Sequence, residues 1–173
     1  MSDHPDPAVP PSPGVQDLAA GVIGRLVERD LTIATCESIT GGGIAAALTE
    51  VPGASAVVRG GLVTYATALK VDLAGVDADW VQRYGVINET TAVEMARGAL
   101  DRCGALVAVA CTGVAGPDPQ DGHEPGDVWL AVAMHAEPQP AILTRHLRLS
   151  GDRAAIRRAT VAGALQMVLD QMR

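Results

Sequence analysis

Three side chains of the sequence could act together in a nucleophilic reaction: Ser38, Tyr65 and Lys70. Ser38 lies between a short apolar run and a glycine-rich stretch, where free backbone N–H groups could bind a phosphate or the oxyanion of an acyl transfer. Lys70 is the only lysine among thirteen basic residues. A buried ammonium can lose its proton and act as a base, which a guanidinium does not do. Ser–Lys pairs are an attested variant of nucleophile–base catalysis, and Tyr65 could relay a proton or orient the pair.

Each of these residues also has a structural interpretation. Ser38 or Thr40 could cap a following helix, and Lys70 could be a solvated helix residue. The histidines are weaker candidates for the base, because His123 falls in a loop-like segment and the four show no metal-ligand spacing. The three cysteines form no CxxC pair and are expected to be reduced, buried small hydrophobes. We expect neither a bound metal nor a cofactor.

Charge and hydrophobicity indicate which partners and which cellular location to expect. The net charge of -7 argues against a nucleic-acid or anionic-membrane surface. No apolar run reaches the about 18 residues of a membrane span, and the first residues are acidic and proline-rich, unlike a signal peptide. We therefore expect a cytoplasmic protein whose partner is a small molecule, with no nucleic acid and no membrane.

The hydrophobic pattern predicts alternating helices and strands. Residues 1–13 are rich in proline and polar residues and are expected to form a disordered tail, which leaves residues 14–173 as a single domain. The expected helices are 15–29, 42–49, 68–73, 78–84, 89–103 and 151–172. The expected strands are 30–36, 56–66 with a bulge or bend at Gly60–Gly61, 105–111 running into a glycine-rich loop at 112–117, 127–136 and 141–150.

This order, with few aromatic residues and many Ala, Val, Leu and Ile, predicts an α/β fold: a three-layer α/β/α sandwich around a mixed, largely parallel sheet. Parallel strands place their ligand site at their carboxyl ends. Two glycine-rich loops, "ESITGGG" and "TGVAGP", follow such ends. We therefore expect the site to form where these loops meet.

Six motifs occur in an order that resembles the CinA C-terminal domain family: "CESITGG", "VVRGGLVTYATALK", "YGVINETTA", "AVACTGVAGP", "GDVWLAVA" and "LSGDRAAIRR". The resemblance runs from about Val15 to the C-terminus. Stand-alone members of that family are nicotinamide-nucleotide amidohydrolases, and relatives are often dimers. The resemblance thus implies hydrolysis of the carboxamide of nicotinamide mononucleotide to nicotinic acid mononucleotide and ammonia, a step of pyridine nucleotide salvage, by a homodimer.

The resemblance also assigns roles residue by residue. Ser38 corresponds to the nucleophile, and Tyr65 and Lys70 to the residues that assist it. Backbone N–H groups near Gly41 and Gly42, alone or together with the Thr112 loop, would bind the oxyanion, and arginines of the last helix would bind the phosphate. The residues expected to contact substrate are Glu37, Thr40, Gly41, Gly42, Thr112, Gly113, Ala115, Gly116, Arg153 and Arg157. Alternatively, Glu37 only orients Lys70 or pairs with an arginine, and the two arginines lie on a solvated helix face.

Two departures from the family pattern are Asn88, where serine is usual, and Asp127, where threonine is usual. Asparagine and serine both cap helices, so we expect the fold to survive. Asp127 would repel an anionic substrate if it faced the site. The alternative to an enzyme is a non-catalytic nucleotide-binding or regulatory module of the same fold, but both Ser38 and Lys70 are present. We also expect Lys70→Arg to fold normally, because the charge and the stem are similar.

Overall fold

The computed structural model describes residues 14–173, so the predicted N-terminal tail lies outside the described residues. The helices are α1 (Val15–Glu28), α2 (Gly43–Thr49), α3 (Thr67–Asp72), α4 (Ala78–Tyr84), α5 (Glu89–Cys103) and α6 (Arg153–Gln171), with a 3₁₀ turn at Ala54–Ala56. The strands are β1 (Ile33–Glu37), β2 (Val58–Val63), β3 (Val107–Gly113), β4 (Asp127–Met134) and β5 (Ala141–Arg148). The order of these elements is the one that the sequence predicts.

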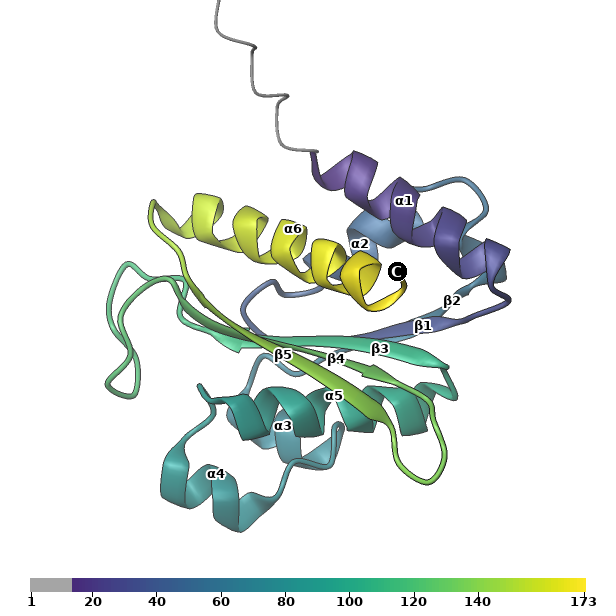
Figure 1. The fold of residues 1–173 in the computed structure, drawn as a ribbon. Helices are drawn as coiled ribbons and strands as arrows, with labels where there is room; N and C mark the ends of the chain where they lie inside the picture. The colour runs from purple at the N-terminus through teal and green to yellow at the C-terminus, as the bar shows by residue number, and fades with distance from the viewer. Residues whose placement is uncertain (1–13) are drawn as a thin grey trace, which may run out of the picture.

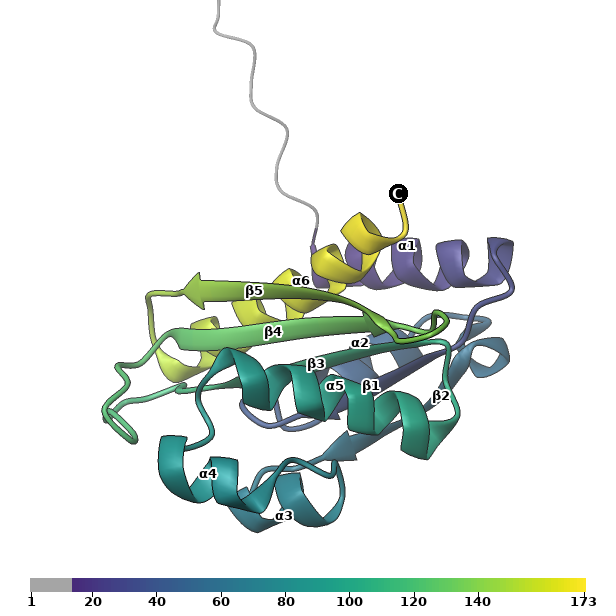
Figure 2. The same ribbon diagram turned by 60° about the horizontal axis from the view of Figure 1, so that its bottom comes forward.

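One five-stranded sheet, in the order β2-β1-β3-β4-β5, forms the middle layer. β1 pairs in parallel with both β2 and β3, whereas β4 is antiparallel to both β3 and β5. Within this sheet, only β4 therefore runs against the others. Helices α1, α2 and α6 cover one face, and α3, α4 and α5 lie on the other (Figures 1 and 2). The predicted three-layer sandwich around a mixed, largely parallel sheet is confirmed.

The two faces of the sheet differ in side-chain size. Toward α1, α2 and α6 the central strands present large apolar residues such as Ile33, Val109 and Leu130. Toward α5 they present alanines and a cysteine: Ala34, Cys36, Ala108, Ala110, Ala131 and Ala133. Small side chains let a helix lie close to the sheet, so α5 packs with its own alanines against this face. This close packing accounts for a large core with almost no aromatic residues.

Local sequence signals set the ends of the elements that border the site. The Asn88 side chain accepts a hydrogen bond from the Thr91 amide at 2.9 Å and so caps α5, as predicted, and Gly104 ends that helix with a φ of 58°. In β2 the register with β1 shifts between Val58 and Gly60, which confirms the bulge. β2 ends at Val63, earlier than predicted, because the chain then turns toward α3.

No helix within residues 14–173 is both long enough and apolar enough to cross a bilayer.

The close packing of α5 predicts opposite effects for two glycine substitutions inside helices. A Cβ at Gly98 on α5 would lie 1.8 Å from the Ala74 carbonyl oxygen, whereas a Cβ at Gly24 on α1 has nothing within 4 Å. We expect Gly98→Ala to lower the free energy of unfolding by about 1–3 kcal/mol or more, because the backbone must move apart. Gly24→Ala should raise it by about 0.4–1 kcal/mol. Urea denaturation of the two variants measures both, and equal stabilities would contradict the packing.

Candidate active site

The turn between β1 and α2 carries Ser38. The Ser38 amide donates to the Cys111 carbonyl of β3 at 3.1 Å, and the Gly41 amide donates to the Ser38 carbonyl at 3.0 Å. Gly41 and Gly42 have φ angles of 61° and 96°, which favour glycine over other residues. The glycines therefore serve to bend the chain sharply, and the serine is held at the carboxyl end of β1.

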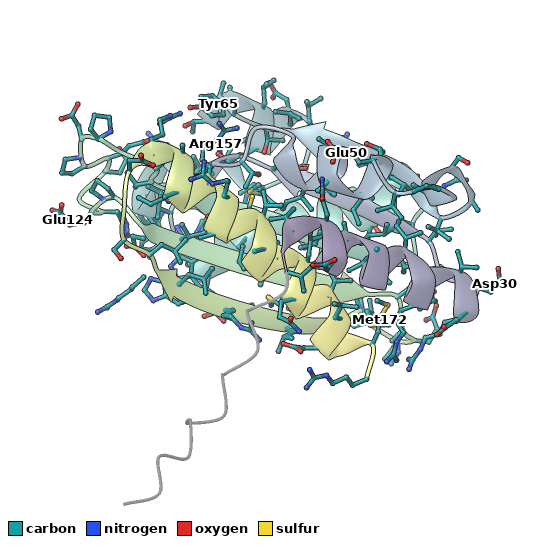
Figure 3. All side chains as sticks on the ribbon, turned by 90° about the horizontal axis from the view of Figure 1, so that it is seen from above. Asp30, Glu50, Tyr65, Glu124, Arg157 and Met172 are labelled. Atoms are coloured by element: carbon teal, nitrogen blue, oxygen red, sulfur yellow. The ribbon has the colours of Figure 1, made fainter. Side chains whose placement is uncertain are left out.

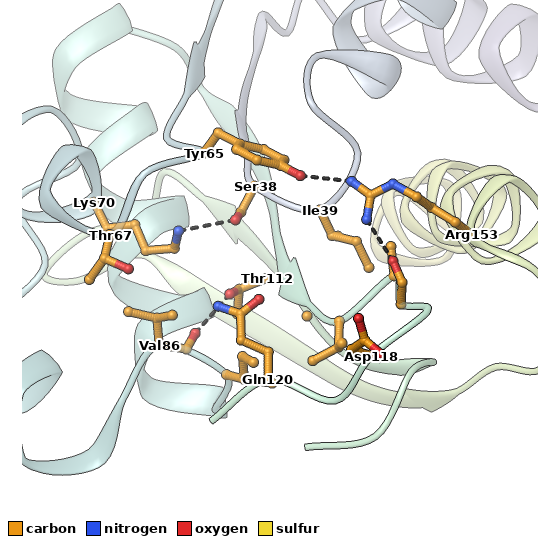
Figure 4. Close-up of a pocket in the computed structure, with 15 residues that line it drawn as sticks. Ser38, Ile39, Tyr65, Thr67, Lys70, Val86, Thr112, Asp118, Gln120 and Arg153 are labelled. Carbon is orange, nitrogen blue, oxygen red and sulfur yellow. Dashed lines mark hydrogen bonds between the residues drawn. The ribbon is translucent and has the colours of Figure 1, made fainter. Parts of the chain in front are cut away.

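Lys70 lies beside Ser38 although 32 residues separate them in the sequence. Its Nζ donates to Ser38 Oγ at 3.0 Å and to the Thr64 carbonyl oxygen at 2.8 Å (Figure 4). The side chain comes from the short helix α3 and is only 1% exposed. The interpretation of Lys70 as a solvated helix residue is therefore wrong.

Burial lowers the pKa of Lys70 below its ordinary value of 10.5. Negative charge on the nearby Cys36 and Cys111 would oppose this shift. Burial, however, raises the pKa of Cys36 to about 12 and that of Cys111 to about 11, so both thiols are neutral at physiological pH. The surroundings of Lys70 thus favour the uncharged amine, which is the form that can take a proton.

A cavity of about 190 Å³ opens over Ser38 and Lys70. The loop after β3 forms one wall with Thr112, Gly113, Ala115 and Gly116, and Arg153 of α6 lies on the same side. The two glycine-rich loops therefore meet at the carboxyl ends of the parallel strands β1 and β3, as predicted.

Seven further residues of the cavity wall have no role in the sequence-based site: Ile39, Thr67, Val86, Ile87, Val114, Asp118 and Gln120. The buried Thr112 hydroxyl donates to the Val86 carbonyl at 2.7 Å and so ties the loop after β3 to the residues before α5. Asp118 and Gln120 come directly after the "TGVAGP" motif, and that position was the signal that could have identified them.

Tyr65 lies at the mouth of the cavity and is 58% exposed. Its hydroxyl accepts a hydrogen bond from Arg153 Nη2 at 2.7 Å, while Arg153 Nη1 donates to the Gly116 carbonyl at 2.9 Å (Figure 4). Within the described part of the chain, no hydrogen bond joins the Tyr65 hydroxyl to Ser38 or Lys70. Tyr65 thus lines the same cavity as Ser38 and Lys70, but its hydroxyl pairs with Arg153.

Glu37 has a structural role in place of the expected substrate contact. It is fully buried, and its carboxylate accepts hydrogen bonds from the amides of Ile44 and Ala45 at 2.9 and 2.8 Å and from the Thr40 hydroxyl at 2.6 Å. Glu37, rather than Ser38 or Thr40, therefore caps α2. The alternative contacts of Glu37 with Lys70 or an arginine are not formed among the described residues.

The backbone amides of the Ser38 turn differ in their hydrogen bonds and in whether they border the cavity. The Gly41 amide is already bonded to the Ser38 carbonyl, and neither Gly41 nor Gly42 lines the cavity. The Ile39 amide has no hydrogen-bond partner among residues 14–173, although Ile39 is only 4% exposed and lines the cavity. The Thr40 backbone forms a hydrogen bond with the Cys111 thiol, and Thr40 does not line the cavity. Unpaired buried N–H groups are rare in proteins and often mark a functional site.

Arg157 lies behind the turn, on the side away from the cavity. Its Nε donates to the Ile39 carbonyl at 3.2 Å and its Nη2 to the Thr40 carbonyl at 2.6 Å. It lines a separate hollow between α1, α2 and α6, which is the side seen in Figure 3. Of the two arginines predicted to contact the phosphate, only Arg153 borders the cavity.

Asp127 does not line the cavity, so its carboxylate does not face a ligand bound there. It forms hydrogen bonds with His123 and His146, and His146 stacks on Trp129. Burial tends to raise the pKa of Asp127, but the bonds from His146 and His123 outweigh it and lower that pKa. Within residues 14–173, no group of three or more His, Cys, Asp and Glu side chains is arranged to hold a metal ion.

Comparison with known proteins gives the family. Residues 15–172 match the model of the CinA C-terminal domain. The chain belongs to this family. A CinA-like protein of Frankia casuarinae is 44% identical over 156 residues, and one of Akkermansia muciniphila is 40% identical over 163 residues. These matches cover 90% and 94% of the chain but only 35% and 39% of the relatives, so the chain spans little more than a third of their length.

Solved structures of the CinA superfamily have the same fold. The competence/damage inducible protein CihA of Agrobacterium tumefaciens is 39% identical with a TM-score of 0.87, over 93% of this chain and 98% of that one. A CinA superfamily protein of Enterobacter cloacae is 26% identical with a TM-score of 0.90, over 100% and 99% of the two chains. The family resemblance noted in the sequence is thus confirmed.

The buried amine predicts a pH-dependent stability. Because the pKa of Lys70 is lower in the folded protein than its ordinary 10.5, the unfolded chain binds more protons between the two values. The free energy of unfolding should therefore rise with pH in this window, by up to about 1.4 kcal/mol per pH unit, relative to a Lys70→Met variant. Urea denaturation of both proteins between neutral pH and about pH 10 measures the difference in their free energies of unfolding. The upper limit lies near the pKa of lysine in an unfolded chain.

Loss of the hydrogen bond to Thr64 in Lys70→Met shifts the difference by an amount that does not depend on pH. Only the slope of this difference against pH therefore reports the lowered pKa of Lys70. A difference that stays constant with pH would show that the amine has its ordinary pKa.

Proposed function

We propose that the protein is an amidohydrolase that converts nicotinamide mononucleotide to nicotinic acid mononucleotide and ammonia. The observation that carries the proposal is the buried Lys70 amine, 3.0 Å from the Ser38 hydroxyl in the wall of a cavity. A base within hydrogen-bond reach of the proton it takes, with a lowered pKa, meets both requirements of general base catalysis. The choice of substrate follows from the resemblance to stand-alone members of the family, and the homodimer remains a prediction.

In the acylation step, the neutral Lys70 amine accepts the Ser38 proton as Oγ attacks the carboxamide carbon. The Thr64 carbonyl oxygen, which accepts one Nζ proton, holds the amine so that its lone pair can face Oγ. The resulting ammonium donates a proton to the leaving nitrogen, which departs as ammonia and leaves an ester on Ser38.

In the deacylation step, Lys70 takes a proton from water as the water oxygen attacks the ester carbon, and it returns that proton to Ser38 Oγ. The oxyanion of both tetrahedral intermediates would be bound by the unpaired amide of Ile39 at the cavity wall. The amide of the residue after the nucleophile has this role in other serine hydrolases.

Charged groups at the cavity wall suit the two ends of the substrate. Arg153 can bind the phosphate at the mouth, because a guanidinium matches a phosphate with two parallel N–H donors. The Asp118 carboxylate complements the positive charge of the pyridinium ring. The presence of both Ser38 and Lys70, in contact, supports an enzyme over a non-catalytic module of the same fold.

The first test is release of ammonia from nicotinamide mononucleotide by the purified protein. Ser38→Ala should lower kcat by at least about 10³-fold, the scale seen when a serine nucleophile is removed. Ser55→Ala, which changes an exposed serine outside the cavity, is the matched control and should keep normal activity. No ammonia release by the wild-type protein, or full activity in Ser38→Ala, would refute the proposal.

The second test concerns the base. The wild-type kcat should rise with pH as the amine loses its proton, with an inflection below 10.5. Lys70→Arg should lack this inflection and lower kcat by about 10²-fold or more, because a guanidinium stays protonated.

The structure corrects one expectation for this variant. Lys70 is buried, so Lys70→Arg places a larger, permanently charged group in the core and should destabilise the protein. Circular dichroism is therefore needed to select conditions under which the variant is folded. Near-normal kcat in the folded variant would exclude a catalytic role for the amine.

A further inference from the structure

Asp118 and Gln120 line the cavity over Ser38, but the segment that carries them has no apolar anchor. This segment lies between β3 and β4 and projects from the end of the sheet (Figures 1 and 2). Residues 117–122, "PDPQDG", are all exposed, and none of them belongs to a hydrophobic cluster within residues 14–173. An exposed loop with few buried contacts opens readily unless polar contacts hold it. The position of these two side chains at the cavity therefore depends on hydrogen bonds.

The tip of this segment is a tight turn closed by two backbone hydrogen bonds. The Gln120 amide donates to the His123 carbonyl at 3.0 Å, and the His123 amide donates to the Gln120 carbonyl at 2.9 Å. Between them, Asp121 and Gly122 have φ angles of 51° and 81°, as in two-residue hairpin turns of the Asp–Gly type. Within the described chain, no other hydrogen bond involves residues 117–122. Gln120 is therefore placed by whatever holds His123.

His123 is held by Asp127, the first residue of β4. His123 Nδ1 lies 2.5 Å from Asp127 Oδ2, and His146 Nε2 of β5 contacts the other carboxylate oxygen. Burial raises the pKa of Asp127, but the hydrogen bonds from His146 and His123 lower it below its ordinary value. The carboxylate is thus ionised at neutral pH and can only accept hydrogen bonds, so both imidazoles donate to it.

His146 fixes the direction of the Asp127 carboxylate. Its ring stacks on that of Trp129, its partner in the β4–β5 register, with ring centroids 4.3 Å apart and an angle of 2° between the planes. The stacked ring keeps its Nε2–H on one carboxylate oxygen, which leaves the other oxygen for His123. A continuous set of contacts therefore joins the sheet to the cavity wall. It runs through His146, Asp127 and His123 and ends at Gln120.

We infer that Asp127 is a positioning residue, which acts through His123 and does not touch the substrate. It holds Asp118 and Gln120 at the cavity before a ligand arrives. This inference rests on the proposed function, because it concerns the wall that would bind the substrate of the same site. Asp127 and His123 both lie outside the cavity wall, so a change at either residue reaches a bound ligand only through the loop. A loop that is already in place loses less conformational freedom when the substrate binds.

The kinetic experiment compares Asp127→Ala with wild type on nicotinamide mononucleotide. We expect KM to rise by about 3- to 10-fold and kcat to stay within about 2-fold, because the loop must then be ordered by the substrate while Ser38 and Lys70 are unchanged. Glu124→Gln is the matched control and should keep both constants, because Glu124 is an exposed acid of the same segment that does not line the cavity. An unchanged KM in folded Asp127→Ala overturns the inference, whatever its kcat.

A conservative variant covers the case in which Asp127→Ala does not fold. Asp127→Asn has the same shape and keeps one acceptor oxygen, but it loses the charge and the second acceptor. It should raise KM in the same way but to a smaller extent. A folded Asp127→Asn protein with the wild-type KM would contradict the positioning role.

Double variants show whether the effect passes through the loop. His123→Ala should raise KM as Asp127→Ala does, and the two changes together should raise it no further, because both break the same contact. In a background that carries Asp118→Ala and Gln120→Ala, the change at Asp127 should leave KM unaltered, because the side chains that it positions are gone. Independent, multiplying effects in either comparison overturn the inference.

Amide hydrogen exchange measured by NMR distinguishes failure of this inference from failure of the proposed function. The Gln120 and His123 amides are paired at the tip of the loop, whereas the Gly126 amide donates to the Val114 carbonyl at its base, at 2.8 Å. In Asp127→Ala the two tip amides should exchange at least about 5-fold faster, and the Gly126 amide should keep its rate.

This measurement needs no activity. Faster exchange at the tip in a protein that hydrolyses no nicotinamide mononucleotide would refute the amidohydrolase and still support Asp127 as the residue that holds the loop. Wild-type exchange rates at the tip of Asp127→Ala overturn the inference, whether or not the protein is an amidohydrolase.

Discussion

The contact between the Lys70 amine and the Ser38 hydroxyl is the interaction on which the arrangement of the site depends. An amine without a carboxylate partner is stable in a protein interior only if it loses charge or finds strong acceptors. Here the Thr64 carbonyl supplies one acceptor, and it does so because the Thr64 amide donates to the Glu37 carbonyl at 2.8 Å and holds the end of β2 beside β1. The pairing of β2 with β1 thereby fixes the position of the chain that leads into α3, and α3 in turn places the Lys70 side chain beside Ser38.

The turn that carries the serine is held by two charged side chains that never meet. Glu37 binds N–H and O–H donors on one side, and Arg157 binds carbonyl oxygens on the other. A tight turn leaves backbone groups without secondary-structure partners, and each such buried group must be satisfied or used. In this turn the carbonyls of Ser38, Ile39 and Thr40 are satisfied, and the Ile39 amide at the cavity wall has no partner among residues 14–173.

The sequence was sufficient to predict the fold and the pairing of Ser38 with Lys70, but not the hydrogen bonds that hold the turn around Ser38. Apolar periodicity and capping residues are local, so the order of elements, the β2 bulge and the Asn88 cap could be predicted. Lys70 was identifiable because an amine in an arginine-rich chain is chemically distinctive. The roles of Glu37 and Arg157 could not be identified from the sequence, because they depend on which side of the Ser38 turn faces α6. Spacing along one helix placed Arg157 beside Arg153 but could not show that the turn passes between them.

The position of α6 at the end of the described chain has a consequence for protein synthesis. β1, the Ser38 turn and α3 are translated well before α6, which carries Arg153 and Arg157. A nascent chain that lacks α6 has its serine and lysine but no guanidinium on the Ile39 and Thr40 carbonyls. The Ile39 and Thr40 carbonyls therefore gain these hydrogen bonds only after α6 has been translated and has docked on the turn.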